Sequence, residues 1–368
     1  MTSEGLPVPD RLPGELFDLA VALVAIPSTS RSEARIADAL EADLRRCSHL
    51  RVERIGDSLV ARTELGRARR VVLAGHLDTV PASGNAGARV EGDVLYGLGS
   101  VDMKGGIAVL VDLARSLRAP DADITYIFYA CEEVDHSENA LAHLARERPE
   151  LIRADAAVLC EPTGRVMEAG CQGTMRVAVR IGGRRAHSAR PWMGSNAIHR
   201  TGGLLSMLAS YEGRHVVIDG CEYAEQLQAV KIEGGVAGNV VPDEALVVLN
   251  YRFAPDRSSL EAETALRSLL GPVIDTSAGD AIDVLDAAEG APPSLSSPLL
   301  AALRDATSKP PKAKVGWTDV ATFHAAGVPA ANFGPGDPAL AHSPEERVTR
   351  SELVGARKVL AEVLGSRF

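Results

Sequence analysis

The strongest constraint on the fold comes from short apolar runs that alternate with helical segments. Residues 103–117 and 139–146 repeat their apolar positions at helical spacing, which predicts two helices. Short apolar runs bounded by turn-forming or charged residues predict strands, here at residues 59–62, 71–74, 124–130 and 156–159. Strands that alternate with helices are typical of a mostly parallel sheet covered by helices on both faces. We therefore predict an α/β domain, whose ligands gather where its strands end.

The middle of the chain has a different pattern. Alternating apolar residues predict strands at residues 175–181, 227–233, 245–253 and 282–285, with amphipathic helices at residues 195–210 and 258–270. Two amphipathic helices suit one face of an antiparallel sheet. We predict an inserted α+β (ferredoxin-like) domain at residues 174–286, within a first domain formed by residues 1–173 and 287–368. Two domains also suit a length of 368 residues.

Charge and cysteine content restrict the function classes. The formal net charge of −10 argues against nucleic acid as a partner, because phosphate binding needs clustered Lys and Arg. The five cysteines are scattered and odd in number, as in reduced cytoplasmic enzymes. Residues 1–13 lack the features of a signal peptide, and no apolar run has the length of a membrane-spanning helix. We therefore expect a cytoplasmic protein with no membrane partner.

His76 and Asp78 come directly after the apolar run at residues 71–74. A neutral imidazole is a good zinc ligand, and a carboxylate commonly holds its other ring nitrogen. Because residues i and i+2 of an extended chain face the same side, Asp78 can orient His76. The alternative is an ordinary histidine at a strand end beside an aspartate that caps a turn, so this pattern is weak by itself.

Asp102 follows a glycine-rich segment, residues 97–100, and stands where a helix N-cap belongs. One interpretation is that it only caps the helix. A nucleotide-binding loop is disfavoured, because the third glycine of the dinucleotide fingerprint is missing and no G-K-[ST] follows. A carboxylate held rigidly in this loop could instead bridge two metal ions.

Glu132 and Glu133 follow the apolar run at residues 124–130. Adjacent residues of an extended chain point to opposite sides, so one carboxylate can bind a metal while the other takes a proton from the attacking water. The alternative is a solvated acidic loop. Glu161 follows another apolar run and His342 lies in a late loop, and each of these two alone is a weak signal.

The joint placement of these residues favours a metal site. Four predicted parallel strands each present His, Asp or Glu at their carboxyl ends, and the late loop adds a second His. The candidate ligands are His76, Asp102, Glu133, Glu161 and His342. Such a set suits a pair of zinc ions, with one His and one terminal carboxylate for each ion and one carboxylate that bridges them. Paired zinc ions polarise a carbonyl group and generate hydroxide at neutral pH, which predicts an amide hydrolase.

The order of these motifs resembles the M20 metallopeptidase family over nearly the whole chain. The shared features are H-x-D, then G-x-G-x-x-D-x-K-G, then E-E, then E-P and a late His. The resemblance implies two Zn²⁺ ions per subunit, with Co²⁺ able to replace them. It further implies that His76 and Glu161 bind one ion, that Glu133 and His342 bind the other, and that Asp102 bridges the two.

The resemblance also assigns roles outside the metal ligands. It implies that Asp78 orients His76 and that Glu132 is the general acid/base. The inserted domain is similar to the family's lid and dimerisation domain, which implies a homodimer. His187 then matches the histidine that reaches the partner subunit's active site and stabilises the oxyanion.

The substrate implied by the resemblance is a small N-acyl amino acid, specifically N-succinyl-LL-2,6-diaminopimelate. Its carboxylates need Arg and hydroxyl donors, and Asn239, Arg252 and Thr318 stand at matching positions. The alternatives are an acetylornithine deacetylase, another N-acyl amino-acid amidohydrolase or a carboxypeptidase of the same family, which the metal motifs do not separate. A non-catalytic binding protein on this fold is a further alternative, although every expected metal ligand and the general base are present in the sequence.

Overall fold

The computed structural model describes residues 11–307 and 309–365 and falls into two compact units. The large unit comprises Met1–Gly170, Pro293–Lys312 and Asp319–Phe368, and the small unit comprises Cys171–Pro292 and Ala313–Thr318. The chain thus enters the small unit twice, whereas the sequence predicts a single insertion at residues 174–286. Most of the segment on which the signal-peptide prediction rests, residues 1–10, lies outside the described residues.

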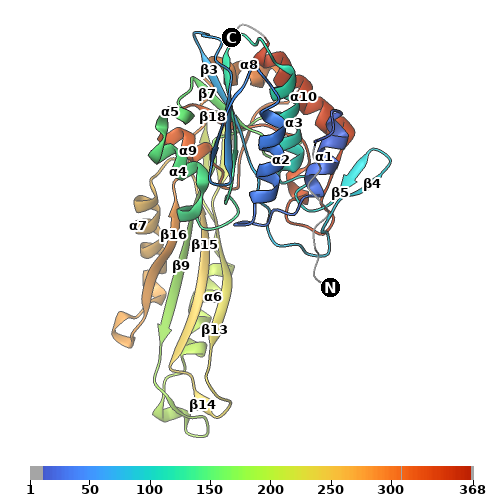
Figure 1. Cartoon of the computed structure of the whole chain (residues 1–368). Coiled ribbons are helices and arrows are strands. Elements are labelled where there is room, and N and C mark those ends of the chain that lie inside the picture. Colours follow the sequence, from blue (N-terminus) through green and yellow to red (C-terminus); the bar gives the residue numbers. More distant parts are fainter. Residues whose placement is uncertain (1–10, 308, 366–368) are drawn as a thin grey trace. The chain divides into compact units, whose positions relative to one another are not determined.

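An eight-stranded sheet forms the core of the large unit (Figure 1). In spatial order its strands are β1 (Arg51–Ile55), β2 (Ser58–Arg62), β6 (Asp123–Tyr129), β3 (Arg70–His76), β7 (Ala156–Leu159), β18 (Ala330–Asn332), β8 (Glu168–Ala169) and β17 (Lys312–Ala313). The middle strands β6, β3, β7 and β18 run parallel. On one side β2 and β1 continue antiparallel, and on the other β8 does so. The predicted mostly parallel sheet is confirmed, but the run at residues 59–62 is an antiparallel strand.

Helices cover both faces of this sheet, as predicted (Figure 1). One face carries α1 (Leu16–Val24), α2 (Ala34–Leu44), α3 (Lys104–Ser116), α8 (Pro298–Ala306) and α10 (Arg350–Leu364), and the other carries α4 (Ala140–Glu147), α5 (Pro149–Ile152) and α9 (Val320–Ala325). Within residues 11–307 and 309–365, no helix combines the length and the apolar character that crossing a membrane would require.

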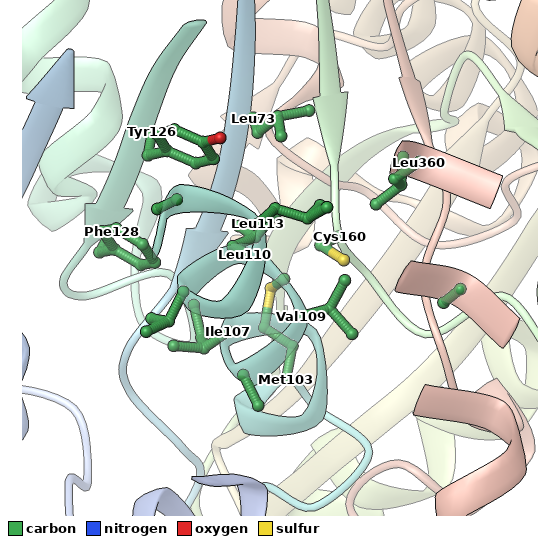
Figure 2. Close-up of a cluster of buried hydrophobic side chains, with 14 of the residues drawn as sticks. Leu73, Met103, Ile107, Val109, Leu110, Leu113, Tyr126, Phe128, Cys160 and Leu360 are labelled. Atoms are coloured by element: carbon green, nitrogen blue, oxygen red, sulfur yellow. The ribbon is translucent and has the colours of Figure 1, made fainter. Parts of the chain in front are cut away.

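The core between α3 and the sheet is tightly packed. Ile107, Leu110 and Leu113 recur at helical spacing and belong to one buried cluster with Leu73 of β3 (Figure 2). Full burial of such a side chain contributes about 1.5–3 kcal/mol. A β-carbon at Gly106 would overlap the carbonyl oxygen of Cys160, so glycine allows α3 to approach the end of β7. This packing gives the carboxyl ends of the strands a rigid support.

A separate three-stranded antiparallel sheet contains the strand that leads into the loop with Asp102. Its strands are β4 (Arg89–Glu91), β5 (Val94–Tyr96) and β19 (Arg347–Thr349). The chain leaves β5, passes through the glycine-rich loop and enters α3 at Lys104. Asp102 is therefore supplied by this loop and not by a parallel strand of the main sheet. The prediction of four ligand-bearing parallel strands is wrong for this residue, because strands of three residues leave no periodic signal.

The small unit contains a four-stranded antiparallel sheet in the order β13-β15-β9-β16. Its main elements are β9 (Gly173–Gly182), α6 (Ala197–Ala209), β13 (Gln226–Gly234), β15 (Glu244–Phe253), α7 (Ser259–Leu270) and β16 (Ala281–Ala288). Leu204 of α6 and Leu266 of α7 share one buried cluster with Val247 of β15, so both helices cover the same face. Shorter pairs are β10 (Ala186–His187) with β14 (Val240–Val241), and β11 (His215–Ile218) with β12 (Cys221–Ala224).

Candidate functional site

Most of the candidate residues lie at or just after the carboxyl ends of three neighbouring strands of the large unit. β3 ends at His76, β6 ends at Tyr129 shortly before Glu132, and β7 ends at Leu159 shortly before Glu161. These strands are adjacent and parallel, so their carboxyl ends lie at one edge of the sheet. Polar side chains that follow an apolar strand are thereby gathered in one place.

His76 is buried, and both of its ring nitrogens have polar neighbours. Its Nδ1 lies 3.0 Å from the backbone carbonyl oxygen of Asp78, and its Nε2 lies 3.1 Å from Oδ1 of Asp102. Because a carbonyl oxygen only accepts hydrogen bonds, Nδ1 carries the proton of the neutral ring and the Nε2 lone pair faces Asp102. A lone pair and a carboxylate at this distance repel each other unless a proton or a cation lies between them. The ring is therefore oriented to present Nε2 to a cation.

The Asp78 carboxylate fixes the backbone that follows β6. The backbone N–H of Glu132 donates to Oδ1 (3.0 Å), the N–H of Glu133 donates to Oδ2 (3.0 Å), and the hydroxyl of Ser30 also donates to Oδ2 (2.7 Å). Burial alone would raise the pKa of Asp78, but His76 and the two backbone amides lower it to about 2. Asp78 therefore stays ionised, contacts His76 mainly through its carbonyl oxygen, and positions both glutamates.

Asp102 lies between two histidines. Its Oδ1 is 3.1 Å from Nε2 of His76, and its Oδ2 is 3.5 Å from Nε2 of His342. The peptide bond that follows Asp102 is cis. Glu346 holds the loop, because its buried carboxylate accepts hydrogen bonds from the backbone N–H groups of Val101 (2.9 Å) and Asp102 (3.0 Å). A carboxylate that presents a different oxygen to each of two imidazoles has the geometry of a bridging ligand.

Glu133 and His342 form a second pair at this edge. Nε2 of His342 lies 2.7 Å from Oε1 of Glu133. Hydrogen bonding to Asp102 and Glu133 raises the pKa of His342 to about 10. Burial alone would lower the pKa of His76, but the carboxylates of Asp102 and Asp78 raise it well above its usual value. Both shifts have the same cause, which is an excess of negative charge around the two rings.

Glu132 and Glu161 are two further acidic groups close to these rings. Burial and the neighbouring charge of Glu133 raise the pKa of Glu132 well above its usual range, while His76 opposes and Glu161 reinforces the shift. Glu161 is itself buried, and its charge also raises the pKa of His76. Both carboxylates are therefore electrostatically close to the histidine that ends β3.

The donor atoms at this edge fit a divalent metal ion. One nitrogen of His76 and one carboxylate oxygen each of Asp102 and Glu133 all lie within 4.8 Å of one another. Imidazole nitrogen and carboxylate oxygen are ligands that zinc accepts, and dications would neutralise the surplus negative charge. His342 adjoins this group through Glu133 and Asp102, whereas Glu161 lies outside the closest three.

Several residues behind the site carried no functional signal in the sequence. Asp319 is fully buried and accepts hydrogen bonds from the amide of Asn139 (2.8 Å) and the hydroxyl of Thr322 (2.6 Å). Its charge raises the pKa of Tyr129, whose deep burial is the larger cause. The Tyr129 ring in turn lies edge-on to the His76 ring, with centroids 6.3 Å apart. Asp319 thus belongs to a polar layer beneath His76.

The remaining predicted residues lie in the small unit. His187 is exposed, and its Nδ1 accepts a hydrogen bond from the backbone N–H of Ala189 (3.1 Å). Asn239 adjoins it, because the Asn239 carbonyl oxygen accepts a hydrogen bond from the N–H of Ser188 (2.9 Å). Arg252 belongs to β15. The fourth, Thr318, is buried, and no group among the described residues forms a hydrogen bond with its hydroxyl.

Sequence comparison places the chain among known hydrolases. The model of the peptidase family M20/M25/M40 matches residues 72–366. A protein of Mycobacterium tuberculosis named putative succinyl-diaminopimelate desuccinylase is 50% identical over 96% of this chain and 99% of its own length. A Corynebacterium glutamicum protein named succinyl-diaminopimelate desuccinylase is 44% identical over 99% of this chain and 100% of its own length.

Solved structures share the fold at low sequence identity. A tripeptidase from Staphylococcus aureus has a TM-score of 0.79 at 19% identity, covering 96% of this chain and 98% of its own. A Bacillus subtilis protein described as a dinuclear metal-binding peptidase of the M20 family has a TM-score of 0.66 at 15% identity, with coverage of 95% and 96%. At such identities the likeness establishes a common fold and nothing finer.

Proposed function

The chain belongs to the peptidase family M20/M25/M40, and from this premise we propose that it is a succinyl-diaminopimelate desuccinylase. It is a metal-dependent amide hydrolase. The proposed reaction converts N-succinyl-LL-2,6-diaminopimelate and water to succinate and LL-2,6-diaminopimelate, a step of lysine and cell-wall precursor biosynthesis. The observation that carries the proposal is the identity of 50% and 44% to relatives of that name over nearly full length.

We propose that two Zn²⁺ ions bind at the carboxyl edge of the large sheet. His76 and Glu161 would hold one ion, Glu133 and His342 the other, and Asp102 would bridge them. The two oxygens of Asp102, each facing a different histidine, support this division. When bound, the ions would polarise the substrate carbonyl and lower the pKa of water. Co²⁺ should also serve, because it accepts similar ligands.

Glu132 is proposed to accept a proton from the attacking water and pass it to the leaving amine. Its backbone is held by Asp78, which also holds the backbone of the neighbouring ligand Glu133. One carboxylate therefore sets the relative position of the proton acceptor and a metal ligand. This shared anchor supports the assignment of different roles to the two adjacent glutamates.

The substrate assignment is tested by comparing two N-acyl compounds under identical conditions. We expect kcat/KM for N-succinyl-LL-2,6-diaminopimelate to exceed that for N-acetylornithine by about 10⁴, because a site that hydrogen-bonds a substrate group rejects an analogue without that group on this scale. Asn239, Arg252 and the buried hydroxyl of Thr318 are the proposed donors to the substrate carboxylates. A preference for N-acetylornithine would overturn the substrate, while the hydrolase assignment would stand.

His187 is proposed to stabilise the oxyanion that forms at the substrate carbonyl. Because its Nδ1 accepts a hydrogen bond from Ala189, the neutral ring carries its proton on Nε2, which is the nitrogen available to donate. We expect His187→Ala to lower kcat by about 10²–10³, with unchanged metal content. The matched control is His199→Ala, which removes another exposed histidine of the small unit and should leave kcat near the wild-type value.

Mixed dimers test whether His187 acts across a subunit boundary. Co-expressed Glu132→Ala and His187→Ala chains should recover about a quarter of wild-type activity, since random pairing puts about half the subunits in mixed dimers and each mixed dimer holds one complete site. Action within one subunit predicts no recovery at all.

A homodimer is proposed through the exposed edge of the small unit. β13 is an outer strand of its sheet, and eight of its nine residues are exposed. Val230 and Ile232 are 58% and 53% exposed, and Ile198 of the adjoining α6 is 40% exposed. An open strand edge with apolar side chains favours pairing with another chain.

Charged residues on this edge are expected to separate the subunits. Val230→Lys combined with Ile232→Lys should convert a dimer to a monomer in light scattering, because like charges would face each other across the interface. Val354→Lys changes an equally exposed valine of α10 (50%) and should leave the dimer intact. A double variant that remains dimeric at micromolar concentration would place the interface elsewhere.

A cytoplasmic location is part of the proposal. All five cysteines are free thiols, and three of them, Cys160, Cys171 and Cys221, are buried. Free thiols in this number support a reducing compartment, where disulfides are rare.

A further inference from the structure

A surface cavity of about 360 Å³ lies at the end of the large sheet opposite to the candidate metal site. Five arginines line it: Arg62, Arg67, Arg69, Arg70 and Arg153. Arg70 begins β3 and His76 ends it, so the cavity and the metal ligands are separated by roughly 20 Å at about 3.3 Å per residue. Such a concentration of cations is unexpected in a chain with a formal net charge of −10.

Three carboxylates, those of Asp123, Glu150 and Asp155, also line the cavity. Asp123 accepts hydrogen bonds from the backbone N–H groups of Leu65 (2.8 Å) and Arg67 (2.9 Å) and also pairs with the guanidinium group of Arg70 (3.6 Å). Glu150 is bound by Arg148, whose Nε lies 2.7 Å away. Asp155 accepts a hydrogen bond from the backbone N–H of Arg70 (2.8 Å). Five arginines against these three acids leave the cavity with a surplus of positive charge.

Three of the arginines form no close ion pair with any described residue. Within residues 11–307 and 309–365, the guanidinium groups of Arg62, Arg67 and Arg153 form neither an ion pair nor a hydrogen bond. The Nε of Arg62 is also buried, so its proton is shielded from water. A buried donor without an acceptor costs free energy, which an anion in the cavity would recover.

The neighbours of Arg62 increase this cost. Arg51 stands directly opposite it in the pairing of β1 with β2, and like charges at opposed positions destabilise a sheet. Arg51 is paired with Glu64 (3.3 Å), whereas Arg62 has no close ion pair among the described residues. The hydrogen bond from Arg148, and to a lesser extent the charge of Arg62, lowers the pKa of Glu150. Burial and the charge of Arg62 both lower the pKa of Arg70. A bound anion would reduce the repulsion between these arginines and so stabilise the folded chain.

We propose that this cavity binds the phosphate group of a small molecule. Guanidinium groups match phosphate oxygens in geometry and can donate two parallel hydrogen bonds. Five arginines against three acids suit an anion of charge two, and the volume accommodates a phosphate together with a small organic part. The site is independent of the metal residues and does not depend on the proposed substrate.

Calorimetric titration of the metal-loaded enzyme with inorganic phosphate tests this site. Ionic strength is held constant with chloride, so that general screening is the same throughout. We expect saturable binding, and at least about tenfold weaker affinity in Arg62→Ala and in Arg153→Ala, because hydrogen bonds to charged groups are strong. The control is Arg304→Ala, which removes an arginine of α8 that is paired with Asp305 (2.8 Å) and should leave the affinity unchanged.

Three results would contradict the proposal. The first is an affinity that both cavity variants retain, which would place phosphate elsewhere, at the metals for example. The second is binding of chloride with the same affinity as phosphate, which would indicate only general screening of the positive charge. The third is equal weakening in the Arg304 control. Arg153 is exposed in a loop, so its variant keeps the test valid even if Arg62→Ala is unstable. Hydrolysis without phosphate should be normal in both cavity variants.

Discussion

Replacement of Glu132 by alanine is expected to lower kcat by about 10²–10⁴, the usual contribution of a positioned acid/base group. Metal content should not change, because Glu132 is the neighbour of the ligand Glu133 and not itself a proposed ligand. The backbone contact with Asp78 uses the N–H of residue 132, so it survives the substitution. Steady-state kinetics together with elemental analysis of the same samples would measure both effects.

Two further variants separate chemistry from structure. Glu132→Gln keeps the shape of the side chain but removes its ability to take a proton, so it should be as inactive as Glu132→Ala. Glu345→Ala removes an exposed glutamate near the late histidine and should behave like the wild type. Loss of both metal ions in Glu132→Ala would show that Glu132 supports the metal site, and the proposed proton transfer would then be wrong.

Much of the fold could be predicted because the central strands of the large sheet are apolar on both faces. The run at residues 71–74 became β3 and the run at residues 124–130 became β6, since buried parallel strands leave an unbroken hydrophobic signal. The antiparallel direction of β2 could not be predicted, because a run of four residues has the same pattern in a parallel and an antiparallel strand. β4 has three exposed residues and therefore shows no periodicity.

The candidate site was predictable only where local sequence determines position. His76 is placed by the strand it ends, and parallel register alone brings it beside the acids that follow β6. The role of Glu346 could not be predicted in this way. Its carboxylate accepts a hydrogen bond from the N–H of Val101, which lies 245 residues away along the chain. Ser30 likewise reaches Asp78 across 48 residues. Contacts of this kind depend on tertiary packing, and no nearby residue marks them in the sequence.

Removal of the Asp102 carboxylate is expected to have the other large effect. Each oxygen of Asp102 faces a different histidine, so the substitution would take one ligand from both proposed ions at once. Loss of a group that only supports a ligand weakens metal binding by 10–100-fold, and loss of a shared ligand should exceed about 100-fold. Asp102→Ala should therefore be inactive and lack both ions after dialysis, whereas the wild type keeps them.

Asp102→Asn distinguishes charge from geometry at the same position. The amide keeps an oxygen for one histidine but removes the negative charge, so we expect metal affinity between that of Asp102→Ala and the wild type. Thermal unfolding with and without added Zn²⁺ gives a second readout, because an ion that binds only the folded chain stabilises it according to its affinity. The stabilisation by zinc should be largest in the wild type, smaller in Asp102→Asn and smallest in Asp102→Ala. Equal stabilisation of all three chains would mean that Asp102 fixes the loop before α3, a role that Glu346 already shares, and does not bind the ions.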